Sequence, residues 1–594
     1  MRNAVAFANN DVATIAWSYG AKPEGCMGFA LYRIDSKGKE TPLPSHAVFP
    51  GESIKNGQTT VQFPIQKFYW KDVYARLVGD KTGSYTFRYK VVPLEGAPDA
   101  LKPMTSLPIL TTNEVTISGA CSTSVSAIFN RGLISTQHVS KALKGNASAS
   151  SLLEAIAIEG NQLRKDLAGD ILATLTGFVA RAKTSGSIYA ALYELTDVEL
   201  LQSLVDIGNK LNIVLANIVS KPEKGGSEEK PGENDDSEGR LDKSEASLLY
   251  RQPAIGHIAH NKFLIYVDDQ GTPQAVLTGS CNWTDTGMCA QTNNSIVIED
   301  QGVAARYMAY WKKLQADEKS HAAGGPFQGA TLRKFNSTAK ALALDKGTDE
   351  ASTLTSYFSP NTAKARSRSK TKTEAFPMDM KDLSDRVMAA KNAVLFLAFI
   401  PGTPSITEFA AAAQKQNKDL FVRGCVTSPE AAGNFFYDLR GTAPPKKQKG
   451  VKNPPAPQDP RVISANALDK TVPEGWQKEL LKAGFAITHD KIVVIDPFAD
   501  DCVVVTGSHN LGYQASYNND ENLLMIEGNK KLAMAYATHV LDVYDHFAWR
   551  WTVNNGSAVD VHLKTKPDDW LSWYFDANGN IKTAQLKFWM QATV

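Results

Sequence analysis

The sequence lacks the features that mark several large classes of protein. No run of apolar residues approaches the length of about 18 that suggests a membrane-spanning helix. Only six cysteines occur, scattered without metal-like spacing, which excludes a disulfide-stapled scaffold and a cysteine-rich zinc site. A large net charge is also missing, because 64 Lys and Arg nearly balance 62 Asp and Glu. Any attraction to nucleic acid or to a membrane must therefore come from a local patch.

The composition that remains is typical of a folded chain with several domains. With 43% hydrophobic residues, the 594 residues can bury sizeable cores, and their number allows roughly three to five domains. The first residues contain no apolar signal-peptide core. We therefore expect the protein in the cytoplasm, or exported by a route that needs no signal peptide, with its cysteines reduced and buried.

The N-terminal part, residues 1–97, is predicted to be an all-β sandwich. Short alternating or aromatic stretches are separated by Gly, Pro and Ser turns, and they predict strands at residues 12–17, 29–33, 60–63 and 85–92. An early Trp and a late Tyr-x-Val strand resemble a fibronectin type III domain. Such a module docks or spaces other units more often than it catalyses, so an unidentified protein partner is expected for it.

After Pro103 the pattern changes to α/β. Helical periodicity at 150–183 and 196–210 precedes an apolar strand at 211–215, and a second helix-and-strand unit lies near 380–425. We divide this part into a first lobe, residues 104–345, and a second lobe, residues 346–594. Residues 221–245 and 444–461 are expected to be exposed loops. The Trp-rich C-terminal tail is expected to pack as a lid over the second lobe.

The strongest signal is an internal repeat in the α/β part. Each copy has His-x-Lys before an apolar strand that ends at an Asp, then a strand ending in Thr-Gly-Ser-x-Asn, and then a Glu. The first copy supplies His260, Lys262, Asp268, Ser280, Asn282 and Glu299. The second copy supplies His489, Lys491, Asp496, Ser508, Asn510 and Glu527. The step from Asp to Ser is twelve residues in both copies, which makes coincidence improbable.

These residues resemble the signature of the phospholipase D superfamily, which is His-x-Lys-(x)4-Asp followed by Gly-Ser-x-Asn in two copies. The resemblance covers roughly residues 104–594 and implies two pseudo-repeated α/β lobes with the active site between them. The second copy matches completely, but in the first copy five residues separate Lys262 from Asp268. A β-bulge within 263–267 would bring Asp268 to the place of Asp496. The alternative is that Asp268 has lost its role.

The histidine and the lysine of each copy lie two residues apart, so they share one face of a strand. Bringing the two strands together would place two imidazoles and two ammonium groups around one pocket. A neutral imidazole can attack phosphorus while a protonated one gives a proton to the leaving oxygen. The resemblance implies that His260 is the nucleophile, which forms a phosphohistidine, and that His489 is the general acid. The residues themselves leave that order open.

The other motif residues have supporting roles in this scheme. The two lysines and the two asparagines would donate to the non-bridging phosphate oxygens, where negative charge develops. The two serines would support them through hydrogen bonds, and the two aspartates would brace the fold. Glu299 and Glu527 would accept from the histidine nitrogen that faces away from phosphate. His257 is expected at the rim or in a structural role, and Asn261 and Asp490 are expected to point away from the pocket.

The motif leaves the kind of phosphodiester open, because the superfamily includes phospholipases, transphosphatidylating synthases and nucleases. We favour a metal-independent enzyme, without a cofactor, that hydrolyses a phospholipid headgroup or transfers it to an alcohol. The alternative is a nuclease for DNA or RNA, and the third possibility is an inactive binding protein. Trp283 and residues 435–437 are candidates for a lipid-facing rim. A basic strip suits an anionic membrane, another polyanion or merely a solvated loop, and it contains Lys364, Arg366, Arg368, Lys370 and Lys372.

Overall fold

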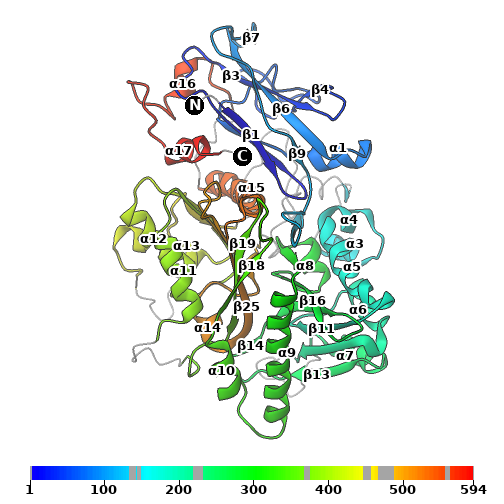
Figure 1. Ribbon diagram of the computed structural model, residues 1–594. Helices are drawn as coiled ribbons and strands as arrows, with labels where there is room; N and C mark the ends of the chain where they lie inside the picture. Colours follow the sequence, from blue (N-terminus) through cyan, green and yellow to red (C-terminus); the bar gives the residue numbers. More distant parts are fainter. Residues whose placement is uncertain are drawn as a thin grey trace.

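The computed structural model arranges the chain as a β-rich N-terminal region above two α/β lobes that lie side by side (Figure 1). The N-terminal region is blue in this view, lobe 1 is cyan to green, and lobe 2 is yellow-green to orange. This is the architecture that the sequence predicts. The structure describes residues 3–132, 142–143, 149–217, 232–366, 375–445, 456–465, 487–555 and 562–592.

The N-terminal region contains two antiparallel sheets, and one short helix, α1 (Ala75–Thr82). The first sheet has the order β1-β2-β5, from β1 (Asn3–Ala8), β2 (Ala13–Ser18) and β5 (Tyr69–Asp72). The second has the order β4-β3-β6-β7, with β8 and β9 also on β6. Its strands are β3 (Gly28–Ile34), β4 (Glu40–Pro42), β6 (Thr86–Glu95), β7 (Lys102–Pro103), β8 (Leu110–Thr111) and β9 (Val115–Thr116).

Two details of this region differ from the sequence-based prediction. The sheet continues to residue 116, because β7, β8 and β9 all pair with β6, so a boundary at residue 97 cuts through it. Residues 60–63 form a turn rather than a strand. In that turn the backbone N–H of Phe63 donates to the carbonyl of Thr59.

The C-terminal tail packs partly on lobe 2, as expected, where the ring of Phe588 lies 4.6 Å from that of Phe421 on β21. It also packs against the N-terminal sheets, which the sequence analysis did not predict. Its helices are α16 (Pro567–Leu571) and α17 (Ala584–Met590). The indole of Trp570 donates to the carbonyl of Cys26 at 2.9 Å, and its ring lies 5.6 Å from that of Phe68. Trp589 stacks on Tyr69 with 4.6 Å between the ring centroids. The tail therefore joins the two ends of the chain through a shared aromatic core.

Lobe 1 is built on a sheet with the order β10-β17-β16-β15-β11-β12-β13. The strands are β10 (Val125–Phe129), β11 (Ser187–Leu192), β12 (Leu211–Ala216), β13 (Ser247–Arg251), β15 (Lys262–Val267), β16 (Pro273–Gly279) and β17 (Asn294–Ile298). The helices are α3 (Ala149–Ala157), α4 (Gln162–Ala168), α5 (Asp170–Thr184), α6 (Val198–Val205), α7 (Asp235–Asp242), α8 (Asp285–Cys289), α9 (Gln301–Ala322) and α10 (Ala330–Asn336).

Lobe 2 has the sheet order β18-β19-β25-β24-β23-β20-β21-β22. The strands are β18 (Lys340–Leu344), β19 (Ser352–Ser359), β20 (Ala393–Ala398), β21 (Phe421–Val426), β22 (Val462–Ser464), β23 (Ile492–Ile495), β24 (Val503–Gly507) and β25 (Asn519–Glu527). The helices are α11 (Met378–Met388), α12 (Ile406–Gln416), α13 (Pro429–Arg440), α14 (Tyr513–Asn518) and α15 (Lys530–Asn554).

The two lobes repeat one another strand for strand. β15 lies between β11 and β16, and β23 lies between β20 and β24 in the same way. The two central strands, β15 and β23, are the ones that stand at the His-x-Lys motifs. Every residue of β20 is buried, as expected for an apolar strand that is covered on both faces. β18 pairs with β19, so lobe 2 begins near residue 340 rather than at residue 346.

The lobes are joined through the strands that border the motifs. The short strand β14 (Ile258–Ala259) comes from lobe 1 but pairs in parallel with β25 of lobe 2. Thr292 and Thr488 form a matching parallel bridge on the other side. One hydrophobic cluster continues through both lobes and includes residues of α9 and α15. This exchange brings the two motifs to the interface between the lobes.

Some predicted surface segments lie partly outside the described residues. These undescribed parts include Arg368, Lys370 and Lys372 of the basic strip, and residues 446–455. The predicted loop at 221–245 is described from residue 232, where it contains the helix α7. The six cysteines are buried and free, as expected. Among the described residues, the helices include none that is both long and apolar enough to cross a membrane.

Candidate active site

The histidine and the lysine of each motif stand at the start of equivalent strands. His260 precedes β15 and Lys262 begins it, while His489 and Lys491 both directly precede β23. All four residues are at most 5% exposed. Each lysine Nζ donates to the carbonyl of its own histidine, at 2.9 Å for Lys262. Each motif therefore holds its imidazole and its ammonium group as one unit.

Each histidine is oriented by a side chain from the opposite lobe. Nδ1 of His260 lies 2.8 Å from Oε2 of Glu521, which is on β25 of lobe 2. Nδ1 of His489 lies 3.0 Å from Oδ1 of Asn293, which directly precedes β17 of lobe 1. Because Nδ1 is engaged in both rings, Nε2 is the nitrogen that can act on a substrate. The two lobes thus complete each other's histidine.

The motif serines hold these two partners. Ser508 Oγ donates to Glu521 at 2.8 Å, and Ser280 Oγ donates to Asn293 Oδ1 at 2.8 Å. The amide nitrogen of Asn293 donates to the carbonyl of Gly287 at 2.7 Å, which fixes the amide with its oxygen toward the histidine. Each serine therefore supports the histidine of the other lobe, and the expected supporting role takes this crossed form.

Glu299 and Glu527 do not orient the histidines, so that expectation is wrong. Glu299 pairs with Arg181 at 3.0 Å and Glu527 with Arg386 at 2.7 Å. Their side chains are 44% and 43% exposed. The true partners stand six positions earlier in each copy, a separation of about 20 Å along an extended strand. The signal for them was present, because both follow their motif serine by thirteen residues.

Glycine is required before each motif serine by a close backbone approach. Gly279 has φ +148° and Gly507 has φ +137°, conformations that L-residues rarely adopt. A Cβ at Gly279 would lie 2.3 Å from the carbonyl oxygen of Asn294, and a Cβ at Gly507 would lie 2.4 Å from that of Asn522. The Gly-Ser pair therefore lets the motif strand approach the strand that bears the histidine partner.

Burial determines the charge of both imidazoles. It lowers the pKa of His260 to about 4, against the opposing charge of Glu521. His489 faces the neutral amide of Asn293, and burial together with the charge of Lys491 holds its pKa well below the ordinary value. Both rings are therefore neutral at about pH 7, which is the form a nitrogen nucleophile needs. The charge of Lys262, and that of His260 when it is protonated, also lowers the pKa of His489, so the two motifs face a common space.

The two lysines make this space a site for an anion. Burial lowers the pKa of Lys262 to about 8, although Glu521 and Glu194 oppose the shift. Burial and the charge of Lys262 hold the pKa of Lys491 well below its ordinary value. A negative group between these cations would raise both pKa values, because it favours their charged forms. Among the described residues, no three His, Cys, Asp or Glu side chains gather as a metal site would require.

Aromatic rings that the sequence analysis missed lie against both histidines. The ring of Tyr193 is 4.9 Å from that of His260, and the ring of Phe399 is 4.8 Å from that of His489. Each ring also lies about 5 Å from the neighbouring lysine Nζ, at 5.0 Å and 5.2 Å. They directly follow β11 and β20, so only the pairing of these strands with β15 and β23 brings them to the site.

The motif asparagines differ between the lobes. The amide nitrogen of Asn282 donates to Glu194, a residue that the sequence analysis did not single out. Burial and the nearby Glu233 raise the pKa of this carboxyl, while Lys262 opposes the shift. The Oδ1 atoms of Asn282 and Asn510 are both buried without a hydrogen-bond partner. Glu194 therefore occupies the amide of Asn282 that the sequence analysis expected to donate to phosphate.

The motif aspartates occupy different places in the two lobes. The carboxylate of Asp496 accepts three backbone N–H groups of residues 391–393, at 2.7–2.8 Å, where β20 begins. Asp268 instead accepts from the backbone of Gln270 and Thr272 in the turn after β15. Both aspartates brace the fold, but they brace different segments of it.

The predicted bulge within 263–267 is absent, because β15 pairs with β11 without a shift from Lys262 to Val267. The register of β15 with β16 shifts between Tyr266 and Val267, and the additional residue lies on β16. Asp269, not Asp268, accepts the backbone N–H of Gly186 just before β11, at 2.6 Å. The expectation that Asp268 takes the place of Asp496 is therefore wrong.

Other sequence-based expectations have mixed outcomes. Asn261 donates to a tyrosine hydroxyl of α9 at 3.0 Å, and Asp490 lies 2.9 Å from a histidine of α15, so both point away from the histidine pair. His257 is half-buried at the edge of the interface, as expected. Trp283 and Phe435 are 1% and 0% exposed, so they belong to the core and not to a lipid-facing rim.

Comparison with known proteins agrees with the arrangement of the two motifs. A family model described as "Cardiolipin synthase, PLD-like domain" matches residues 178–315 and 446–543, and these two segments contain both copies of the motif. The chain belongs to the phospholipase D superfamily. No curated protein sequence matches this superfamily member. Superfamily membership makes it a phosphodiesterase-type protein.

Three solved structures illustrate the range of similar proteins. Phosphatidylserine synthase from Haemophilus influenzae Rd KW20 is 11% identical, with 64% of this chain and 85% of that chain covered and a TM-score of 0.38. A phospholipase D family member, Nuc, from Salmonella typhimurium is 15% identical, with 32% of this chain and 94% of that chain covered and a TM-score of 0.20. A mutant of yeast tyrosyl-DNA phosphodiesterase is 10% identical, with 61% of this chain and 89% of that chain covered and a TM-score of 0.31. Because these TM-scores are below 0.5, the assignment rests on the family model and the motifs.

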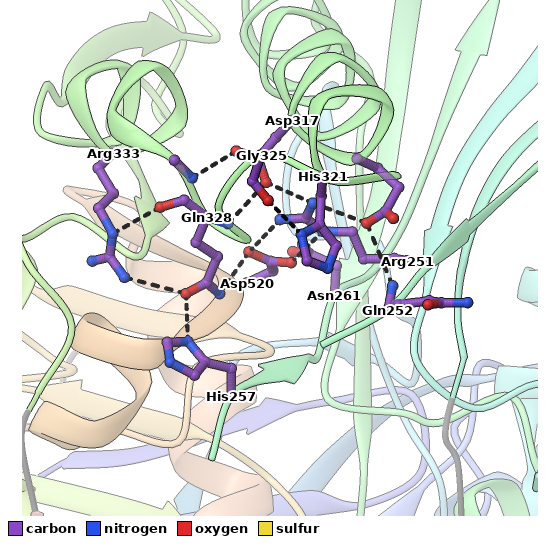
Figure 2. A network of polar contacts seen from close by, with 12 residues as sticks. Arg251, Gln252, His257, Asn261, Asp317, His321, Gly325, Gln328, Arg333 and Asp520 are labelled. Carbon is purple, nitrogen blue, oxygen red and sulfur yellow. Dashed lines mark hydrogen bonds and ion pairs between the residues drawn. The ribbon is translucent and has the colours of Figure 1, made fainter. Parts of the chain in front are cut away.

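A buried ionic network fixes the first motif of this phospholipase D-like chain (Figure 2). Arg251, at the end of β13, pairs with Asp520 of β25 at 2.9 Å and with Asp317 of α9 at 2.7 Å. Gln328 also donates to Asp520, at 3.0 Å. The carbonyl of Asp520 accepts the backbone N–H of His260. The network therefore holds the segment that carries His260 against the opposite lobe.

Proposed function

We propose that the protein is a metal-independent phosphodiesterase that hydrolyses a phospholipid headgroup through a phosphohistidine on His260. The observation that carries this assignment is the difference between the two histidine partners. Glu521 gives His260 a carboxylate, which stabilises the positive charge that its ring acquires on attack. Asn293 gives His489 a neutral amide, which orients the ring without retaining its proton. This difference assigns the nucleophile to lobe 1 and the acid to lobe 2.

The first step forms a bond from Nε2 of His260 to phosphorus and breaks the bond from phosphorus to the headgroup oxygen. The proton of His489 Nε2 passes to that oxygen, so the headgroup leaves as an alcohol and not as an alkoxide. His489 has a low pKa, and the anionic phosphate beside it favours the protonated form that this step needs. Lys262 and Lys491 offset the charge on the non-bridging oxygens in the transition state.

The second step hydrolyses the phosphohistidine, and its proton transfer runs opposite to that of the first step. His489 takes a proton from a water molecule, the water oxygen bonds to phosphorus, and the bond from phosphorus to His260 breaks. The phosphatidyl product leaves and His260 returns to its neutral form. An alcohol in place of water gives headgroup transfer by the same steps. The description of the matching family, a cardiolipin synthase type, favours a phospholipid over a nucleic acid.

The decisive experiment compares substrates in parallel with EDTA present. Vesicles of phosphatidylcholine, vesicles of phosphatidylethanolamine, single-stranded DNA and double-stranded DNA are each incubated with the full chain and with folded His260→Ala and His489→Ala controls. We expect release of a free headgroup that EDTA does not reduce. Release of nucleotides alone would establish the nuclease alternative, and activity that needs an added divalent metal would overturn the mechanism.

A further inference from the structure

The described surface next to the two motifs carries large apolar side chains where solvent reaches them. Ile255 is 85% exposed, the largest fraction among the exposed large apolar residues of the described chain. It precedes His260 by five residues, in a turn where His257 N donates to Ala254 O. Ile400 is 54% exposed and directly follows Phe399, whose ring contacts His489. One exposed isoleucine therefore lies beside each motif.

The N-terminal turn of α14 connects these two positions. The side chain of Gln514 donates to the carbonyl of Gly256 at 3.2 Å, next to Ile255. Gly512 approaches the carbonyl of Pro401, next to Ile400, so closely that a Cβ would collide with it. The segments of lobe 1 and lobe 2 that carry the isoleucines thus meet the same turn, two residues after the motif residue Asn510.

A third apolar side chain and two cations border the same turn. The ring of Tyr513 lies 5.5 Å from that of Phe376, which is 45% exposed. The guanidinium of Arg366 lies 5.9 Å from the ring of Tyr513, the first residue of α14. Lys364, two residues earlier, is exposed. We call Ile255, Ile400, Phe376, Lys364 and Arg366 the docking rim.

The turn that carries Ile255 is held in place, although the Ile255 side chain is exposed. His257, which closes the turn of Ile255, lies 2.7 Å from Oε1 of Gln328 (Figure 2). Gln328 is buried and donates to Asp520 in the network that fixes His260. A mobile loop would lose conformational entropy when it contacts another surface, whereas this turn is already ordered.

We propose that the docking rim seats the enzyme on an anionic phospholipid surface, with the active site facing the lipid headgroups. This inference rests on the proposed function and adds which surface of the protein contacts the lipid layer that contains the substrate. Exposed isoleucine and phenylalanine gain free energy by entering the boundary between headgroups and acyl chains, and adjacent cations are attracted to anionic headgroups. The apolar residues come from separate segments at one edge, an arrangement that suits a fluid layer. The charge of the rim selects anionic vesicles over neutral ones.

The test measures vesicle binding separately from catalysis. Full-length protein is floated with vesicles of equal phosphatidylglycerol and phosphatidylcholine, and with pure phosphatidylcholine vesicles. We expect the Ile255→Ser/Ile400→Ser variant to bind the mixed vesicles about tenfold more weakly or worse, because two apolar side chains no longer leave water. The matched control is Ile109→Ser, since Ile109 is also 54% exposed but lies in the N-terminal region. It should bind as the wild type does.

A soluble diester separates docking from chemistry. Hydrolysis of bis(p-nitrophenyl) phosphate should be unchanged in the Ile255→Ser/Ile400→Ser variant, while its rate on mixed vesicles falls with its binding. Lys364→Gln/Arg366→Gln should lose most of the preference for anionic vesicles, and the loss should be smaller at high salt. Equal binding by the wild type and the isoleucine variant would overturn the docking rim. A wild type that binds vesicles through the rim without releasing a headgroup would overturn the proposed function but not the rim.

Discussion

The two lobes have the same fold, but corresponding positions in them hold different groups. Lobe 2 supplies the carboxylate of Glu521 to the first histidine, whereas lobe 1 supplies the amide of Asn293 to the second. The aromatic residue beside the histidine is followed by Glu194 in lobe 1 and by Ile400 in lobe 2. A duplicated unit builds a symmetric frame, and a few differences at its interface then give two identical imidazoles different surroundings.

The largest effect should come from removing the histidines in turn. We expect His260→Ala and His489→Ala each to reduce hydrolysis of a phospholipid by roughly 10⁴-fold or more. With bis(p-nitrophenyl) phosphate, whose leaving group needs little protonation, His489→Ala should recover part of this loss and His260→Ala should not. Rapid-quench measurement should find a covalent phosphoenzyme in His489→Ala only. A phosphoenzyme in His260→Ala instead would reverse the roles of the two lobes.

A smaller effect should follow from changing the histidine partners. Glu521→Gln removes the carboxylate that stabilises the charged ring of His260, and we expect kcat to fall by about 10- to 100-fold. Glu299→Gln and Glu527→Gln, at the positions that the sequence favoured, should stay near the wild-type kcat. Steady-state kinetics on one soluble diester measures all three variants. Equal losses in the three would show that Glu521 has no special role.

Loss of the aspartate contacts should lower the free energy of unfolding more in lobe 2 than in lobe 1. Asp496→Asn keeps a side chain that tolerates φ +47° but leaves at least one of three backbone N–H groups without its acceptor. We expect the free energy of unfolding to fall by about 1–3 kcal/mol. Asp268→Asn, in an accessible turn, should cost less than about 1 kcal/mol. Urea denaturation of both variants measures the difference, and a larger cost for Asp268→Asn would contradict the comparison.

The pH dependence of kcat/KM should show an acidic limit from His260 and an alkaline limit from Lys262. His260 must be neutral to attack, so kcat/KM should rise with pH through about 4, the pKa to which burial lowers it. His489 must carry a proton, so kcat/KM should already decline above its lowered pKa. The decline should steepen as pH rises through about 8, because Lys262 must be charged to hold the phosphate. Lys262→Arg keeps the charge at high pH and should shift the alkaline limit upward. An alkaline limit that this variant leaves unchanged would assign it to another group.

Much of the architecture could be predicted because it is repeated in the chain. The matched spacing from Asp268 to Asn282 and from Asp496 to Asn510 predicted two equivalent lobes, each with its own His-x-Lys pair. The tail was placed correctly on lobe 2 only in part, because an aromatic cluster indicates a core but not every core it fills. Its Trp570 packs with Phe68 near the other end of the chain, and sequence separation does not reveal that contact.

The sequence by itself determined which side chains belong to each motif, since their spacing along the chain places them on known faces of strands. Only the tertiary structure decided which partner orients each histidine, because the lobes exchange those partners across their interface and no period within one lobe records the exchange. The same holds for Tyr193 and Phe399, which reach the imidazoles through strand pairing between segments distant in the chain.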